Sequence, residues 1–171
     1  MLYGIAFGSN LGNRLENLRS GLSELLSRSQ AKLISASKVY ETEPVDCPEG
    51  SSAYLNAVIE LEAAQSPHEL HRIMQGVETF LGRPEKRDLN APRQLDLDIL
   101  FAGDLTICDE RLTIPHPRLH LRRFVLQPLA DICQQRVLPN QSQTVQALLT
   151  SLKEAPESVF PIASSEWAQL T

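Results

Sequence analysis

The chain has 171 residues, a length that fits one domain with its own core and is short for two. Hydrophobic residues make up 42% of it, yet no apolar stretch reaches the roughly 20 residues that a membrane-spanning helix needs, so no role within a membrane is expected. A net charge of −5 argues against a general nucleic-acid binder, which requires a basic surface.

The first part of the chain alternates strand and helix patterns. The apolar run at residues 3–7 predicts a strand, and leucines at helical spacing over residues 11–26 predict an amphipathic helix. Residues 32–40 and 56–62 are expected to form strands, and the prolines and glycine of residues 42–52 predict a loop between them.

A second helix has clear boundary signals. Ser66 fits the N-cap, Pro67 the first helical position and Glu69 the third, which completes a capping box. Apolar residues at helical spacing continue to Leu81, and Gly82 suits the C-terminal cap. We therefore expect a helix with one buried face between these residues.

The remaining elements are shorter. The polar segment 83–92 predicts an exposed loop, and residues 95–101 predict a strand that turns into a hairpin partner at residues 105–108. Residues 118–129 suggest a turn with a short helix, and residues 145–152 one more helix.

The order strand, helix, strand, strand, helix, strand predicts an α+β fold. It matches a ferredoxin-like sandwich, in which a mainly antiparallel sheet has helices packed on one face. We expect a single domain over residues 1–171, with the weakly patterned residues 153–171 as a peripheral tail.

Cysteine usage and the N-terminus bear on localisation. Cys47, Cys108 and Cys133 are odd in number and form no Cys-x-x-Cys unit, which favours reduced thiols. Residues 1–10 lack the basic start and apolar run of a signal peptide. A cytoplasmic location is expected.

The segment 95–99 carries two acids, Asp96 and Asp98, within an apolar run. In a strand their side chains share one face, with Cα atoms about 6.5 to 7 Å apart. Two neighbouring carboxylates repel each other, and a hard cation such as Mg²⁺ relieves that repulsion. An edge strand whose acids face water explains the pattern about equally well.

Positive charge gathers around these acids. Eight of the 16 Lys and Arg residues fall between positions 83 and 123. Cations for phosphate oxygens beside carboxylates for a metal are what a polyphosphate with magnesium requires. Seven acidic residues share the segment, so solvated surface pairs are the alternative.

Six segments, taken in order, resemble one family. It is the 6-hydroxymethyl-7,8-dihydropterin pyrophosphokinase family of folate biosynthesis, and the resemblance implies the ferredoxin-like fold. It also implies transfer of the pyrophosphoryl group of ATP to the hydroxymethyl oxygen of the reduced pterin, which leaves AMP. The segments are Gly8-Ser9-Asn10-Leu11-Gly12, Tyr40 to Pro44, Tyr54-Leu55-Asn56-Ala57, Glu78 to Arg83, Ala91 to Leu100 and Pro115-His116-Pro117-Arg118.

The resemblance also implies the roles of individual residues. Asp96 and Asp98 would bind two magnesium ions, and Arg83 and Arg93 would contact the triphosphate; these four form the expected catalytic set. Contacts with ATP are implied for Gln75, Ile99, Arg111, Thr113, His116 and Arg122. For the pterin, Tyr54 and Phe124 would stack on the ring, Asn56 would pair with its polar edge, and Thr42, Pro44 and Val45 would add further contacts.

Three positions depart from the family pattern. Glu85 stands where many members have Arg, Asn90 where some have Trp, and Glu43 where Pro is frequent. An acid at position 85 would repel phosphate, which makes ATP affinity the property in question.

Two other functions remain as alternatives. One is a catalytically degenerate relative that binds a pterin or a partner protein through the same residues. The other, a ferredoxin-like nucleic-acid binder, is disfavoured by the acidic composition. No apolar interface stripe is evident in the sequence, and a monomer is expected.

Overall fold

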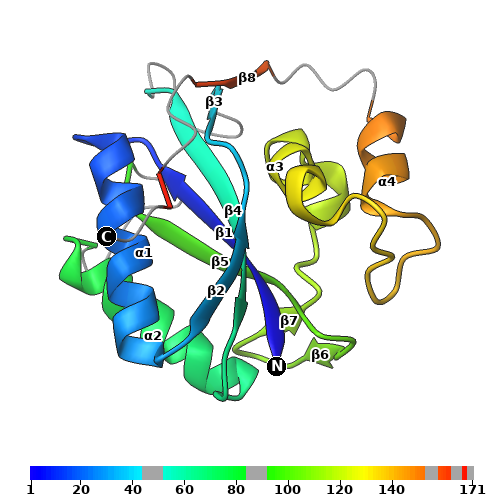
Figure 1. Ribbon diagram of the computed structural model, residues 1–171, viewed down its shortest axis with the longest axis horizontal. Helices are drawn as coiled ribbons and strands as arrows, with labels where there is room; N and C mark the ends of the chain where they lie inside the picture. Colours follow the sequence, from blue (N-terminus) through cyan, green and yellow to red (C-terminus); the bar gives the residue numbers. More distant parts are fainter. Residues whose placement is uncertain (44–51, 84–91, 153–157, 163–166, 169–171) are drawn as a thin grey trace.

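The computed structural model describes residues 1–43, 52–83, 92–152, 158–162 and 167–168. Its main sheet has the strand order β5-β1-β4-β3-β8, with β2 also paired to β4, and the α+β class with an antiparallel sheet is confirmed (Figure 1). In the described part, no helix has the length and apolar character to cross a membrane. The elements are β1 (Leu2–Ser9), α1 (Arg14–Ser29), β2 (Lys32–Ala36), β3 (Tyr40–Thr42), β4 (Tyr54–Glu62), α2 (Pro67–Phe80), β5 (Asp96–Ala102), β6 (Ile107–Cys108), β7 (Thr113–Ile114), the 3-10 helix η1 (Leu119–Leu121), α3 (Arg123–Cys133), α4 (Val145–Ser151) and β8 (Val159–Pro161).

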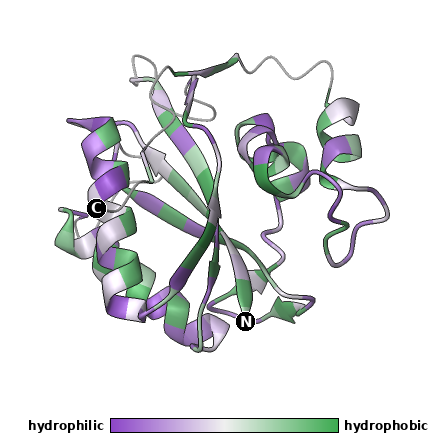
Figure 2. Ribbon diagram, in the orientation of Figure 1, coloured by the Kyte–Doolittle hydropathy of each residue, from purple (hydrophilic) through white to green (hydrophobic). Residues whose placement is uncertain are grey.

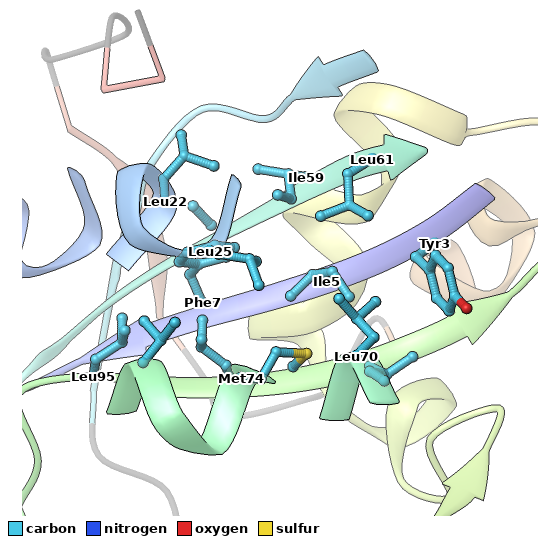
Figure 3. Close-up of a cluster of buried hydrophobic side chains, with 14 of the residues drawn as sticks. Tyr3, Ile5, Phe7, Leu22, Leu25, Ile59, Leu61, Leu70, Met74 and Leu95 are labelled. Carbon is cyan, nitrogen blue, oxygen red and sulfur yellow. The ribbon is translucent and has the colours of Figure 1, made fainter. Parts of the chain in front are cut away.

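The larger core lies between the sheet and helices α1 and α2. Tyr3, Ile5 and Phe7 alternate along β1 and are at most 1% exposed. Leu22 of α1 and Met74 of α2 pack against the same cluster (Figure 3). In Figure 2 the helices carry hydrophilic and hydrophobic residues together, as expected of elements with one face toward a core.

The opposite face of the sheet is also covered, by α3, with α4 packed against α3 (Figure 1). The sequence-based expectation of helices on one face only was therefore wrong. The reason is that Val58 and Leu100 face this side and form a second cluster with Leu126 and Leu129 of α3. Buried apolar groups on both faces of the sheet require cover on both faces.

Local signals explain the helix ends. The capping box at Ser66 and Glu69 is present, and Gly82, with φ of +99°, follows the end of α2 as predicted. Helix α1 begins at Arg14, not near residue 11, because Gly12 adopts φ of +68° and the Asn13 side chain caps the helix by accepting from the Glu16 N–H.

Two strand predictions differ from the structure. Residues 32–40 form two strands, because Ser37 bonds to Val58 through its backbone N–H and its Oγ and interrupts the pairing with β4. Strand β6 pairs with β7, not with β5. Asp109 Oδ1 accepts from the N–H groups of Arg111 and Leu112 and stabilises the β6–β7 turn.

The C-terminal segment contributes to the fold and is not peripheral throughout. Strand β8 adds an antiparallel strand to β3. Trp167 is 1% exposed, donates from Nε1 to the Ser37 carbonyl at 2.9 Å, and contacts Phe7 edge to face at 5.4 Å between ring centroids. The predicted loops at residues 42–52 and 83–92 lie largely outside the described residues.

Candidate functional site

A pocket opens where β1 ends and β4 and β5 begin. Gly8 of β1 pairs with Asn56 of β4 on one side and with Asp96 of β5 on the other, so three strands meet there. Helices α2 and α3, strand β3 and residues between the elements supply the remaining described walls. The described lining residues are Ala6, Phe7, Gly8, Thr42, Glu43, Tyr54, Asn56, Ala57, His71, Gln75, Glu78, Arg83, Arg93, Asp96, Leu97, Asp98, Leu100, His116, Arg118, Arg122, Phe124 and Val125.

The two acids of β5 share one face of the strand, as its alternation requires. They pair across to Gly8 and Ala6 of β1, whose small side chains leave space in front of the carboxylates. Burial, followed by repulsion from Asp96, raises the pKa of Asp98 to about 6 even though three arginines act to lower it. The pair therefore favours a cation between its carboxylates.

Arginines surround Asp96. Arg93 Nη1 donates to Asp96 Oδ1 at 2.8 Å, and Arg83 Nη1 lies 3.6 Å from the same oxygen. Two hydrogen bonds join Asn10 to the Arg93 backbone. The Asn10 backbone N–H donates to the Arg93 carbonyl at 3.1 Å, and Asn10 Oδ1 accepts from the Arg93 N–H at 2.8 Å. These contacts place guanidinium groups beside the acid pair.

Sequence reasoning missed a buried carboxylate that also lines the pocket. Glu78 of α2 is 3% exposed, accepts from the Leu97 N–H at 2.9 Å and pairs with Arg83. Burial raises its pKa to about 7 against the lowering effects of the Leu97 hydrogen bond and of Arg83. The signal was available, since Glu78 occupies a core position of the helix, one residue after Val77 and four after Met74.

His116 lines the same pocket as the acids. Its N–H donates to the Leu100 carbonyl at 3.0 Å, and its Nδ1 accepts from the Arg118 N–H at 3.2 Å. Burial and the charges of Arg122 and Arg118 lower the pKa of His116 to about 4. The ring is neutral at pH 7, and its Nε2 carries the proton.

The pocket also has aromatic walls and an amide group. Tyr54 and Phe124 both line it, and the Arg122 guanidinium lies 5.3 Å from the centre of the Phe124 ring. Asn56, 8% exposed, donates from Nδ2 to Thr42 Oγ1 at 2.7 Å. Beyond this bond, Asn56 still has its acceptor Oδ1 and a second Nδ2 proton, and Thr42 still has its hydroxyl proton.

The structure brings most of the predicted site residues into this one pocket. Arg83, Arg93, Asp96, Asp98, Gln75, His116, Arg122, Thr42, Tyr54, Asn56 and Phe124 all line it, as does Glu43. His71 and Arg118 also line it and were not predicted.

Three predicted residues lie elsewhere. The Ile99 side chain belongs to the core beneath the sheet, whereas Arg111 and Thr113 lie in the β6–β7 hairpin and outside the described lining. Pro44, Val45, Glu85 and Asn90 are outside the described residues.

Comparisons with known proteins agree on one family. Residues 4–134 match the 7,8-dihydro-6-hydroxymethylpterin-pyrophosphokinase (HPPK) family. The chain is 41% identical over 132 residues to the 2-amino-4-hydroxy-6-hydroxymethyldihydropteridine pyrophosphokinase of Bacillus subtilis, which covers 77% of each protein. The Haemophilus influenzae protein of the same name is 40% identical over 85% of this chain and 89% of its own length.

Solved structures show the same fold. A Plasmodium falciparum HPPK-DHPS crystal structure superposes with a TM-score of 0.70 over 88% of this chain and 43% of that chain, at 14% sequence identity. The fold is therefore shared with proteins of very different sequence.

Proposed function

Because this chain belongs to the 7,8-dihydro-6-hydroxymethylpterin-pyrophosphokinase family, we propose that it transfers the pyrophosphoryl group of ATP to the hydroxymethyl oxygen of 6-hydroxymethyl-7,8-dihydropterin. The products are AMP and the pterin diphosphate. The observation that carries the proposal is the union of two half-sites in one pocket. The acid pair among arginines suits a metal-bound triphosphate, and the aromatic and amide end suits a flat, polar-edged ring.

Asp96 and Asp98 are the residues that would hold two Mg²⁺ ions. No group of three or more His, Cys, Asp or Glu side chains suited to a metal occurs among the described residues, which offer a carboxylate pair and not a complete cage. That donor set fits Mg²⁺, which keeps water and phosphate oxygens among its ligands. When bound, the metal neutralises charge on the phosphates.

Arg83 and Arg93 would bind the triphosphate beside the acids. A guanidinium presents a planar fork of donors and stays charged at every relevant pH. His116, neutral at pH 7, would donate from Nε2 to a phosphate oxygen, and Arg122 would add a further positive charge. Together these groups would orient the β-phosphorus toward the attacking hydroxyl.

The pterin would lie between Tyr54 and Phe124. Asn56 Oδ1 would accept from the amino edge of the ring. The Thr42 hydroxyl, whose oxygen already accepts from Asn56 Nδ2, would donate to a ring acceptor. Pro44 and Val45 would add wall contacts. The hydroxymethyl group would then point toward Asp96 along the strand edge at Gly8.

The remaining expected ATP contacts are Gln75, Ile99, Arg111 and Thr113. Gln75 lines the pocket directly, and Ile99 could contribute only through its backbone, since its side chain is 4% exposed in the core. Arg111 and Thr113 would reach the nucleotide from the β6–β7 hairpin. Because one chain supplies all these residues, we propose that the monomer is the active unit.

Product analysis tests the proposal. The purified protein is mixed with ATP, Mg²⁺ and 6-hydroxymethyl-7,8-dihydropterin, and the nucleotides are separated. AMP that forms only when the pterin is present is the expected result. ADP would indicate an ordinary kinase or ATPase, and pterin binding without nucleotide turnover would indicate a degenerate, ligand-binding relative.

A further inference from the structure

Arg14, the first residue of α1, contacts strand β3 and the residue directly before strand β4. Its Nη1 donates to the Ala53 carbonyl at 2.7 Å, and its Nη2 lies 2.8 Å from Glu41 Oε1. Glu41 directly precedes Thr42, and Ala53 directly precedes Tyr54. One guanidinium therefore joins the last residues of β3 to the first residues of β4.

The two strands meet at the point where the pocket begins. Thr42 and Tyr54 are direct partners in the β3–β4 register, and both line the pocket. Arg14 itself is not among the described lining residues. Arg14 therefore influences the positions of Thr42 and Tyr54 from outside the pocket.

We infer that Arg14 is a positioning residue for the pterin half of the site. It fixes the end of β3, which carries Thr42, against the start of β4, which carries Tyr54, so that both side chains keep their positions beside the pterin. Among the described residues, Arg14 has no corresponding contact with Asp96, Asp98 or the phosphate-binding arginines. The inference rests on the proposed function, because it takes the pterin as the ligand of this half.

The two contacts of Arg14 differ in strength. The ion pair is partly exposed, with 29% of the Arg14 side chain and 43% of the Glu41 side chain accessible, and exposed pairs contribute little. The bond from a charged donor to the Ala53 carbonyl is short and stronger. Loss of Arg14 should therefore matter more than loss of the Glu41 charge.

The test uses Arg14→Met, which keeps the aliphatic stem but has no donor. We expect its KM for the pterin to rise about tenfold, the effect of one charge-assisted hydrogen bond, with its KM for ATP and its kcat within about twofold of the parent. Arg14→Lys, which can still donate to the Ala53 carbonyl, should recover most of the pterin affinity. Glu41→Gln should change the pterin KM less than Arg14→Met.

Arg28→Met is the matched control. Arg28 lies on the same helix and makes the same kinds of contact, with Glu24 at 2.8 Å and the Gly76 carbonyl at 3.3 Å, but it does not line the pocket. Its kinetic constants should stay at parental values. Thermal unfolding of both Met variants measures any general loss of stability.

Three outcomes would overturn the inference: equal rises in both KM values, no rise in the pterin KM, or an equal rise in the Arg28 control. Failure of the proposed function looks different, because the parent protein would then form no AMP from ATP and pterin. In that case calorimetric titration with the pterin alone still compares Arg14→Met with the parent, and equal affinities would reject the inference.

Discussion

One carboxylate oxygen of Glu78 accepts a hydrogen bond from the backbone N–H of Leu97 at 2.9 Å. This bond joins α2 to β5 at the residue between Asp96 and Asp98. The same carboxylate pairs with Arg83, which also lies near Asp96. A helix side chain thus fixes both the strand and an arginine of the site.

Substitution of Glu78 separates these two effects. Glu78→Gln keeps an acceptor for the Leu97 N–H and should change the free energy of unfolding by less than about 1 kcal/mol. Glu78→Leu leaves that buried N–H without an acceptor and should destabilise the protein by about 2 kcal/mol. Urea unfolding measures both values, and equal stability of the two variants would contradict the role assigned to this bond.

Asp98→Asn should reduce turnover by several orders of magnitude, because it removes one of the two carboxylates available to Mg²⁺. Its stability without metal should match or exceed that of the parent, since the substitution ends repulsion between neighbouring acids. AMP formation and thermal unfolding are the measurements. The control is Asp104→Asn, an exposed acid beyond the end of β5. Near-parental turnover in Asp98→Asn would refute the metal assignment.

His116 should make stability depend on pH. Its folded pKa, about 4, lies below the ordinary value of 6.5, so the unfolded chain binds more protons between these pH values. The contribution of His116 to the free energy of unfolding is present above pH 6.5 and is lost as the pH falls toward 4. Its size is on the order of 2 kcal/mol after allowance for partial exposure. Unfolding free energies of the parent and His116→Gln at pH 7 and pH 4.5 measure the difference. A constant difference would contradict the lowered pKa.

Gly8 leaves open the space beneath the proposed pterin. A Cβ at this position would lie 3.4 Å from Asn56 Oδ1 and 3.8 Å from Asp96 Cβ, which is ordinary contact. Gly8→Ala should therefore fold and bind the pterin moderately less well, whereas Gly8→Val should fold in its strand but lose pterin binding. Isothermal titration with the pterin measures this series, and parental affinity in the Val variant would place the ring elsewhere.

Local sequence signals predicted the features that depend on neighbouring residues. The capping box at Ser66 and the shared face of Asp96 and Asp98 follow from spacing along one helix and one strand. The resemblance to a family predicted that Tyr54 and Phe124 share one site, and both line the pocket. Their spacing in the sequence alone does not predict this. The roles of all these residues stay predictions until the variants are measured.

Features that depend on distant partners were missed. Ser37 breaks a predicted strand because it bonds to Val58, 21 residues away. Trp167 donates to the Ser37 carbonyl, 130 residues away in the sequence. No local pattern around Trp167 predicts its burial. Helix spacing could have flagged Glu78 as a buried acid, but its hydrogen bond to Leu97 follows only once α2 lies against β5.

The buried indole has an optical consequence. Trp167 is the only tryptophan of the chain, and its ring contacts Phe7, a residue that also lines the pocket. Its fluorescence therefore comes from a single, dry environment one side chain away from the ligand space. We therefore expect ligand arrival near Gly8 to change the emission of Trp167, so that binding is measured without any attached label.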